Sequence, residues 1–300
     1  MATRTVTPGA NLLAAWVLAA RPATLPAAVV PVLVGTAAGE RGLARPLAFL
    51  AALVAALLIQ IGTNFANDYF DFQKGADTAT RLGPRRVTQT GLISPSQVLV
   101  ATVITFGLAA LIGCYLILVG GWPIAVAGVL SILAGVAYTG GPWPLGYHGL
   151  GDVFVFLFFG VIAVVGSAYL QTGSITLLAL ALAVPVGFLI TAILVVNNLR
   201  DIDTDRAAGK RTLAVRIGRP ATRVEYAVMV LGAYLVPMGL WLSGRLGGWF
   251  WLPALSLPLA ALLIRDVTRT TDGPTLNGAL KRTGQLLILF GLLLVGSLIL

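Results

Sequence analysis

Long apolar stretches fill most of the chain, and short polar segments separate them. Nine stretches are long enough to cross the roughly 30 Å hydrocarbon core of a membrane as α-helices. We expect these spans at about 11–37, 46–70, 97–119, 121–140, 150–170, 175–199, 223–243, 249–265 and 283–300. Alternating segments typical of a β-barrel are not seen in the sequence. The pattern therefore predicts an all-α integral membrane protein with nine transmembrane helices.

We expect one transmembrane domain over residues 1–300, with two equivalent four-helix halves at about 11–140 and 150–265 and a last helix at 283–300. Three prolines between residues 22 and 31 predict a kink or break at the start of the first span. The sequence SPSQ at 94–97 predicts a capping box that begins the third span. Gly35 and Gly39 have the spacing of small residues at a close helix contact.

The composition agrees with a membrane protein. Hydrophobic residues make up 58% of the chain and charged residues 10%, whereas soluble domains carry roughly a quarter charged residues. Seventeen of the 20 Lys and Arg residues fall in one set of alternate loops, and three fall in the other. Because positive charge is retained on the cytoplasmic side, we expect the N-terminus and the long polar loops to lie in the cytoplasm, with the chain in the plasma membrane.

This topology also accounts for the formal charge of +9, so the charge does not indicate nucleic-acid binding. The single cysteine, Cys114, excludes a disulfide framework and a cysteine zinc site, and we expect it to be a packed free thiol.

Acidic residues gather at two places. Six of the 11 lie in two short segments, which follow the second and sixth spans. On a helix, Asn67 and Asp71 are i, i+4 partners, and Asn198, Asp201 and Asp205 share a face. Like charges along one face need a compensating cation, and Mg²⁺ typically takes one or two carboxylates together with phosphate oxygens and water. The six aspartates are Asp68, Asp71, Asp77, Asp201, Asp203 and Asp205.

Basic residues alternate with these acids. Lys74, Arg81, Lys210 and Arg211 are suited to bind phosphate. Acidic and basic residues at one end of the bundle therefore predict a Mg²⁺-bound diphosphate at a cytoplasmic mouth. A cation-coupled transporter is the main alternative, since carboxylates within membranes also mark ion pathways. The carboxylates lie at helix ends rather than at the midplane, and the interleaved cations would oppose such a path.

Several motifs resemble a known family. The stretches NDYFDFQKGAD and NNLRDIDTDRAAGKRTLAVRIG are similar to the two aspartate-rich motifs of the UbiA superfamily of intramembrane aromatic prenyltransferases. Four further stretches resemble the branch of 1,4-dihydroxy-2-naphthoate polyprenyltransferases (MenA), namely RPATLPAAVVPVLVGTA, RLGPRRVTQTGLIS, YTGGPWPLGYHGLGD and the asparagine pair in VVNNLRD. By motif, the resemblance covers about residues 15–220.

The resemblance implies a fold and a reaction. The fold is a nine-helix bundle around a central cavity that opens laterally to lipid. The reaction is the Mg²⁺-dependent transfer of a polyprenyl group from polyprenyl diphosphate to 1,4-dihydroxy-2-naphthoate, with loss of CO₂ and diphosphate, to give demethylmenaquinol for menaquinone biosynthesis. A prenyltransferase of this superfamily with another acceptor, such as 4-hydroxybenzoate, is the nearer alternative. No obligate protein partner is implied.

The resemblance also implies roles for residues, and Asp203 is left as a loop charge. The implied metal ligands are Asn67, Asp68, Asp71, Asp77, Asn198, Asp201 and Asp205. The implied catalytic residues are Asp68, Asp71, Lys74, Asp201 and Asp205. The implied diphosphate-binding residues are Asn67, Lys74, Arg81, Asn198, Lys210 and Arg211.

Candidates for the aromatic acceptor come from three polar or aromatic side chains. Arg21 could bind its carboxylate, and Tyr138 or Tyr147 could stabilise a carbocation through the ring face. We expect His148 to be solvated or structural, and Asp152 to be the N-cap of the fifth span.

Overall fold

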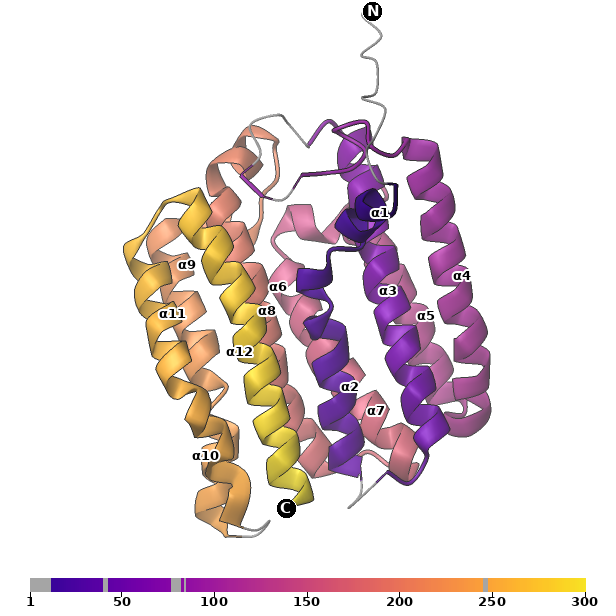
Figure 1. The fold of residues 1–300 in the computed structure, drawn as a ribbon, viewed down its shortest axis with the longest axis vertical. Coiled ribbons are helices and arrows are strands. Elements are labelled where there is room, and N and C mark those ends of the chain that lie inside the picture. Colours follow the sequence, from indigo (N-terminus) through magenta and orange to yellow (C-terminus); the bar gives the residue numbers. More distant parts are fainter. Residues whose placement is uncertain (1–11, 40–42, 77–81, 84, 245–247) are drawn as a thin grey trace, which may run out of the picture.

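The protein is a bundle of helices in a computed structural model that describes residues 12–39, 43–76, 82–83, 85–244 and 248–300 (Figure 1). The α-helices are α1 Leu12–Ala20, α2 Pro26–Gly39, α3 Pro46–Gln73, α4 Pro95–Gly120, α5 Trp122–Ala137, α6 Gly151–Val155, α7 Ala163–Thr172, α8 Leu177–Ala207, α9 Leu213–Gly232, α10 Leu235–Ser243, α11 Leu257–Arg269 and α12 Gly273–Ile299. The short helical turns are η1 Pro22–Thr24, η2 Leu145–His148, η3 Phe156–Ile162 and η4 Gly248–Ser256, of which η3 is a π-helix.

The length and hydropathy of the helices make this an integral membrane protein. Within the described residues, seven helical segments can cross a membrane, and α1–η1 with α2 add an eighth if this bent pair is one span. The span expected at 121–140 is the shorter apolar helix α5, of 16 residues. Seven or eight spans are therefore found by this measure, where nine were expected.

The predicted break in the first span is confirmed. The chain bends by 50° between α1–η1 and α2, and Arg21 at the bend has a φ of 50°, in the left-handed region. Pro22 opens η1, and Pro26 opens α2, because proline cannot donate the backbone hydrogen bond of a helix interior. The capping box is also confirmed, since the Ser94 side chain accepts from the Gln97 N–H and the Gln97 side chain accepts from the Ser94 N–H.

Two helices begin earlier than the apolar pattern predicted. Helix α12 begins ten residues before 283, because the Asp272 carboxylate accepts a hydrogen bond from the Thr275 N–H at 2.9 Å and caps a polar first turn. Helix α9 begins at Leu213, where the Thr212 hydroxyl accepts from the Val215 N–H, and it is interrupted at Gly218, which has a φ of 78°. The hydropathy pattern detects apolar residues, so it missed these polar helical turns.

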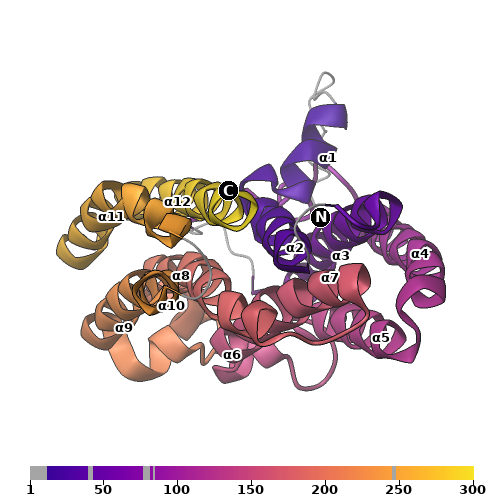
Figure 2. The ribbon, with the colours of Figure 1, turned by 90° about the horizontal axis from the view of Figure 1, so that it is seen from below.

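The helices lie in two groups when the bundle is seen along its long axis (Figure 2). Helices α2 to α5 lie on one side and α8 to α12 on the other, with α7 beside both and α6 beside α8. Helix α12 packs against α2 and α8, and joins the groups. Helices α3 and α8 both end at the same end of the bundle, where α11 turns into α12 (Figure 1).

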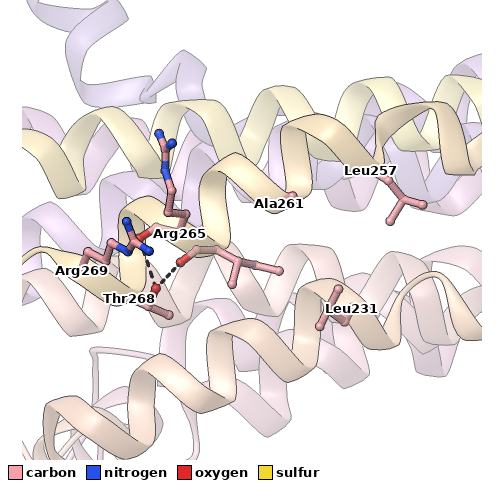
Figure 3. A pocket seen from close by; sticks show the side chains of 7 residues that line it. Leu231, Leu257, Ala261, Arg265, Thr268 and Arg269 are labelled. Atoms are coloured by element: carbon pink, nitrogen blue, oxygen red, sulfur yellow. Dashed lines mark hydrogen bonds between the residues drawn. The ribbon is translucent and has the colours of Figure 1, made fainter.

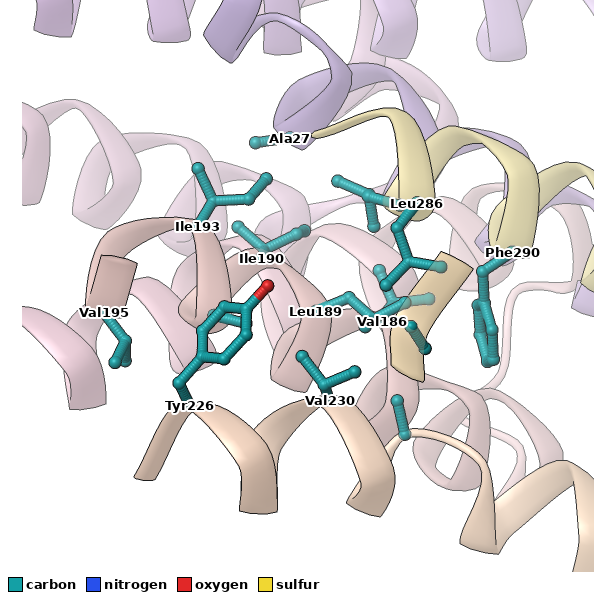
Figure 4. Packing of buried hydrophobic residues seen from close by; sticks show 14 of the residues in the cluster. Ala27, Val186, Leu189, Ile190, Ile193, Val195, Tyr226, Val230, Leu286 and Phe290 are labelled. Atoms are coloured by element: carbon teal, nitrogen blue, oxygen red, sulfur yellow. The ribbon is translucent and has the colours of Figure 1, made fainter. Parts of the chain in front are cut away.

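The main core surrounds α8, which is the most buried of the long helices. Leu189 and Ile190 of α8 pack with Val230 of α9 and with Leu286 of α12 (Figure 4). In a membrane, such contacts stabilise the bundle mainly by van der Waals packing. Inside this core the hydroxyls of Tyr226 and Thr283 share a hydrogen bond at 2.8 Å, which satisfies two buried polar groups.

The contact predicted from Gly35 and Gly39 is confirmed between α2 and α7. A β-carbon on Gly35 would lie 2.2 Å from the Val164 carbonyl oxygen, and one on Gly39 would lie 2.7 Å from Cβ of Gln171. Cys114 is a free thiol as expected, but the prediction that it is packed was wrong, because its side chain is exposed on α4. An apolar lipid-facing surface looks like a core in the sequence, so hydropathy could not separate the two.

Candidate active site at the ends of α3 and α8

The last turns of α3 carry the first acidic segment. Asp68 and Asp71 are only 1% and 2% exposed, and Asn67 is half-buried beside them. The helix ends at Gln73, and Gly75 follows with a φ of 64°, which a residue with a side chain rarely adopts. The apolar helix thus ends with its carboxylates inside the protein, where each needs a partner.

Three donors from distant parts of the chain converge on Asp71. Its Oδ2 accepts from Arg86 Nη2 at 3.0 Å, and its Oδ1 accepts from Lys210 Nζ at 3.2 Å and from the Tyr147 hydroxyl at 2.6 Å. Lys210 follows α8, and so its ion pair with Asp71 joins the two acidic segments directly. The sequence predicted that these segments meet, but it did not show that a lysine lies between them.

A second cation lies beside this cluster. Lys74 Nζ and Lys210 Nζ lie 5.0 Å and 4.6 Å from the ring centroid of Tyr147, within the range of cation–π attraction. Lys74 also donates to the Thr139 carbonyl at 2.7 Å, and the Thr139 hydroxyl donates to Asn67 Oδ1 at 2.8 Å. Burial lowers the pKa of Lys74, the negative charge of Asp71 opposes this, and the charge of Lys210 lowers the pKa further.

Asp68 has a different environment from Asp71. Its carboxylate accepts from the backbone N–H groups of Val87 and Thr88, each at 3.2 Å, and from the Thr88 hydroxyl. These bonds fix the loop that carries Arg86 against the end of α3. Asp68 therefore positions a neighbour of Asp71 in this structure.

The second acidic segment lies on the last turns of α8. The Arg200 guanidinium binds Asp201 in a bidentate manner, at 2.8 Å and 2.5 Å. Arg200 also donates to Asn197 Oδ1 at 2.8 Å and to Asn277 Oδ1 of α12 at 2.7 Å. Asn277 in turn donates to the Leu82 carbonyl at 2.9 Å, so this network ties α8 and α12 to the loop after α3.

The other residues of this segment divide between buried and exposed positions. Asn198 is 8% exposed, and Asp205 is half-buried one turn beyond Asp201, with its backbone carbonyl bound by the Lys210 N–H. Asp203 lies on α8 rather than in a loop, and it is exposed and pairs with Arg219 at 2.7 Å. Arg211 is exposed, and its backbone N–H donates to the Tyr147 carbonyl at 2.9 Å. Asp77 and Arg81 lie outside the described residues.

A cavity of about 110 Å³ lies inside the bundle beside the polar cluster. Its walls include Tyr138 together with the aromatic rings of Phe154, Phe158 and Phe159. Thr63 lies on its α3 side, one turn before Asn67, and Tyr138 directly precedes the Thr139 that binds Asn67 and Lys74. The polar cluster and the apolar cavity are therefore neighbours.

Among the residues proposed for the acceptor, Arg21 and Tyr147 lie at this end of the bundle. Arg21 Nη2 donates to the Asn64 carbonyl of α3 at 3.4 Å, one turn before Asp68. His148 stacks on Trp143 with 4.3 Å between ring centroids, and its Nδ1 lies 2.8 Å from the Pro144 carbonyl oxygen, as expected of a structural histidine.

The expectation for Asp152 was wrong. Leu150 is the N-cap of α6, and Asp152 lies inside the first turn. Asp152 is buried, and its Oδ2 has no hydrogen-bond partner within the part of the chain that the structure describes. The sequence shows an acidic residue near the start of a helix, but it does not fix the helix boundary to one residue.

The donor set fits a magnesium ion that binds together with phosphate. Within the described ranges, no three acidic, histidine or cysteine side chains lie close enough to hold an ion by themselves. The nearby oxygen donors are carboxylates and side-chain amides, which Mg²⁺ prefers, and it commonly completes its shell with substrate phosphate and water. Lys74, Arg86 and Lys210 place positive charge beside these oxygens.

Sequence reasoning missed three residues of this network, namely Arg86, Arg200 and Asn277. Arg86 and Arg200 were counted only as loop charges, although each binds a buried aspartate: Arg86 pairs with Asp71, 15 residues earlier, and Arg200 pairs with its neighbour Asp201. The adjacent Arg–Asp pair was an available signal for Arg200, whereas no signal close in sequence indicated Arg86. Asn277 was assigned to a loop because the start of α12 was placed too late.

Comparisons with known proteins agree with this geometry. The model of the UbiA prenyltransferase family matches residues 28–275. The chain is 41% identical to the 1,4-dihydroxy-2-naphthoate octaprenyltransferase of Escherichia coli (strain K12), over 94% of each chain. It is 40% identical to the protein of the same name from Mycobacterium tuberculosis, over 95% of this chain and 97% of that one.

Solved structures share the fold at low sequence identity. A UbiA homolog from Aeropyrum pernix K1 gives a TM-score of 0.67 at 14% identity, over 96% of this chain and 98% of that one. A UbiA homolog from Archaeoglobus fulgidus, bound to DMAPP and Mg²⁺, gives 0.66 at 14% identity, over 94% and 99%. By the match of the family model and the two relatives, the chain belongs to the UbiA prenyltransferase family.

Proposed function

We propose that this protein transfers a polyprenyl group from polyprenyl diphosphate to 1,4-dihydroxy-2-naphthoate, with release of CO₂ and diphosphate. The product is a demethylmenaquinol, an intermediate of menaquinone biosynthesis. The names of the relatives support the acceptor. The observation that carries the proposal is the convergence of Arg86, Lys210 and Tyr147 on Asp71, directly beside an aromatic cavity.

The polar cluster is the diphosphate end of the site. As the allylic C–O bond breaks, negative charge grows on the leaving diphosphate, and Lys74, Arg86 and Lys210 stabilise it. Arg81 and Arg211 are further candidates for this anion. Bound Mg²⁺ would supply additional positive charge to the same group. The residues that we propose to hold Mg²⁺ are Asn67, Asp71, Asn198 and Asp205, with Asp77 as a further candidate.

Asp68 and Asp201 were expected to be metal ligands, and we propose positioning roles for them. Asp68 is bound by two backbone N–H groups and a hydroxyl, and it holds the loop of Arg86 in place. Asp201 is bound by Arg200, which is itself held by Asn197 and Asn277. Loss of either aspartate would displace a cationic or amide group beside the diphosphate.

The apolar cavity is the isoprenoid end of the site. The allylic cation that remains after the C–O bond breaks lies among Phe154, Phe158 and Phe159, where little water can reach it. The ring face of Tyr138 stabilises this positive charge. The naphthoate ring donates an electron pair from carbon, a C–C bond forms, and the ring loses its carboxylate as CO₂. Arg21 is the candidate for binding that carboxylate before it leaves.

We place the polar end of the bundle in the cytoplasm and the protein in the plasma membrane. The distribution of Lys and Arg supports this orientation, because the end at which α3 and α8 terminate also carries most of the basic loop residues. Water-soluble naphthoate and diphosphate would then exchange with the cytoplasm.

An acceptor assay tests the proposal. The purified protein in lipid nanodiscs receives Mg²⁺, a polyprenyl diphosphate and equal amounts of 1,4-dihydroxy-2-naphthoate and 4-hydroxybenzoate. We expect mass spectrometry to detect the prenylated naphthoquinol as the main product. Prenylated 4-hydroxybenzoate as the main product would reject the acceptor and keep the family reaction. No prenylated product with either acceptor would reject the proposed reaction.

A further inference from the structure

A second pocket lies far from the polar cluster, in a groove between α9 and α11 (Figure 3). Its volume is about 410 Å³, which is larger than the internal cavity. Its two ends differ in character, since apolar side chains line most of its length and two arginines lie at one end (Figure 3). The lining residues are Leu231, Leu257, Ala261, Ile264, Arg265, Thr268 and Arg269.

The basic end of the groove has more positive than negative charge. Asp266 accepts from Arg282 at 2.9 Å and from Arg265 at 3.2 Å, so one carboxylate is shared by two guanidinium groups. Arg269 is exposed, and it makes no hydrogen bond or ion pair with any residue in the described ranges. Two arginines therefore share the Asp266 carboxylate, Arg269 adds a further positive charge at this end, and the excess suits an anion.

The position of the groove matches a lipid rather than a soluble anion. The arginines are at the end of α11 that turns into α12, which is the end of the bundle that carries the acidic segments (Figure 1). From there the apolar part runs along α11 toward the membrane interior. At a rise of 1.5 Å per residue, Leu257 lies about 12 Å from Arg265 along the helix, which is comparable with much of an acyl chain.

We propose that this groove binds an anionic phospholipid. The phosphate lies against Arg265 and Arg269, and one acyl chain follows Leu231, Leu257, Ala261 and Ile264. The Thr268 hydroxyl is engaged with the Ile264 carbonyl at 2.7 Å, so the guanidinium groups are the phosphate donors. A zwitterionic lipid fills the apolar part equally well, but the arginines attract its headgroup less strongly because the headgroup carries no net negative charge.

Native mass spectrometry of the purified full-length protein tests this site, with phosphatidylglycerol or phosphatidylcholine of matched chains as probes. We expect more phosphatidylglycerol than phosphatidylcholine to bind. Arg269→Gln should lower phosphatidylglycerol occupancy about fivefold. One basic residue near an anionic lipid surface contributes about 1 kcal/mol of attraction, which corresponds to this change in affinity. Arg269→Lys should restore most of it. Ala261→Phe, which fills the apolar part, should lower binding of both lipids.

Arg206→Gln is the matched control, because Arg206 is exposed at the same end of the bundle, outside the groove, and pairs only weakly with Asp203 at 3.9 Å. This variant should bind phosphatidylglycerol as the unaltered protein does. Equal binding of the two lipids to the unaltered protein would overturn the proposal. An equal loss in Arg206→Gln and Arg269→Gln would also overturn it, since it would indicate a general charge effect. Helical circular dichroism confirms that each variant is folded.

Discussion

At the scale of single residues, Asp68 and Asp71 lie one helical turn apart at the end of α3 but have different hydrogen-bond partners. Asp71 accepts from three side-chain donors, whereas Asp68 accepts from the backbone N–H groups of Val87 and Thr88 and from the Thr88 hydroxyl. Side-chain donors can turn from a carboxylate to a phosphate, but backbone donors cannot. The sequence spacing grouped both aspartates as ligands, because spacing does not show which donors are near.

Replacing each aspartate by asparagine separates the two roles. Asp71→Asn should lower the rate of Mg²⁺-dependent prenyl transfer about 100-fold or more, because it removes charge at the reacting diphosphate. It should also lower the free energy of unfolding, because Arg86 and Lys210 lose a buried ion-pair partner. Asp68→Asn should lower the free energy of unfolding by about 2 kcal/mol, since it weakens charge-assisted bonds to a buried loop. Equal effects of the two variants on both rate and unfolding would contradict this division.

The lowered pKa of Lys74 predicts that the binding of polyprenyl diphosphate depends on pH. Its pKa is lowered by burial, so it loses its proton, and its attraction for diphosphate, at a lower pH than an ordinary lysine. Diphosphate binding should therefore weaken as pH rises toward the alkaline range, with the full contribution of Lys74 present below its lowered pKa. Lys74→Arg keeps the charge, so the KM for polyprenyl diphosphate should rise at a higher pH in this variant. Identical KM profiles against pH would exclude Lys74 as the titrating group.

At the scale of helices, the α2–α7 contact shows how small residues set the distance between two helices. Gly35→Ala would place a β-carbon 2.2 Å from the Val164 carbonyl oxygen, which is backbone and cannot turn aside. We expect a loss of about 1–3 kcal/mol in the free energy of unfolding. Gly166→Ala on the same α7 is the matched control, since a β-carbon there has no atom within 4 Å. Thermal unfolding of both variants in detergent should show a loss only for Gly35→Ala.

Most helices and the turn chemistry could be predicted from the sequence, and the exceptions have physical reasons. Capping residues and prolines act through neighbours in sequence, so the break in the first span and the start of α4 were predicted correctly. The first ten residues of α12 are polar but helical, because Asp272 caps them and α12 packs against α8 and α11. The exposure of Cys114 and the cap of α6 depend on tertiary packing, which hydropathy does not report.

At the scale of the whole molecule, the site forms because α3 and α8 end together. The meeting of the two acidic segments was predictable from their matching positions after even-numbered spans. The convergence of Arg86, Lys210 and Tyr147 on one carboxylate was not, because these residues come from three separate connections that only the folded bundle brings together. The aromatic cavity beside them also arises from several helices.

The proposed reaction joins the two ends of this site, and the fate of the acceptor carboxylate tests it most directly. Carboxyl-labelled 1,4-dihydroxy-2-naphthoate is incubated with Mg²⁺, polyprenyl diphosphate and the purified protein, and labelled CO₂ and prenylated product are counted together. The proposed reaction predicts one CO₂ for each prenylated quinol, with both lost in Asp71→Asn and on removal of Mg²⁺ by a chelator. A prenylated product that keeps the label, or turnover that persists in Asp71→Asn, would contradict it.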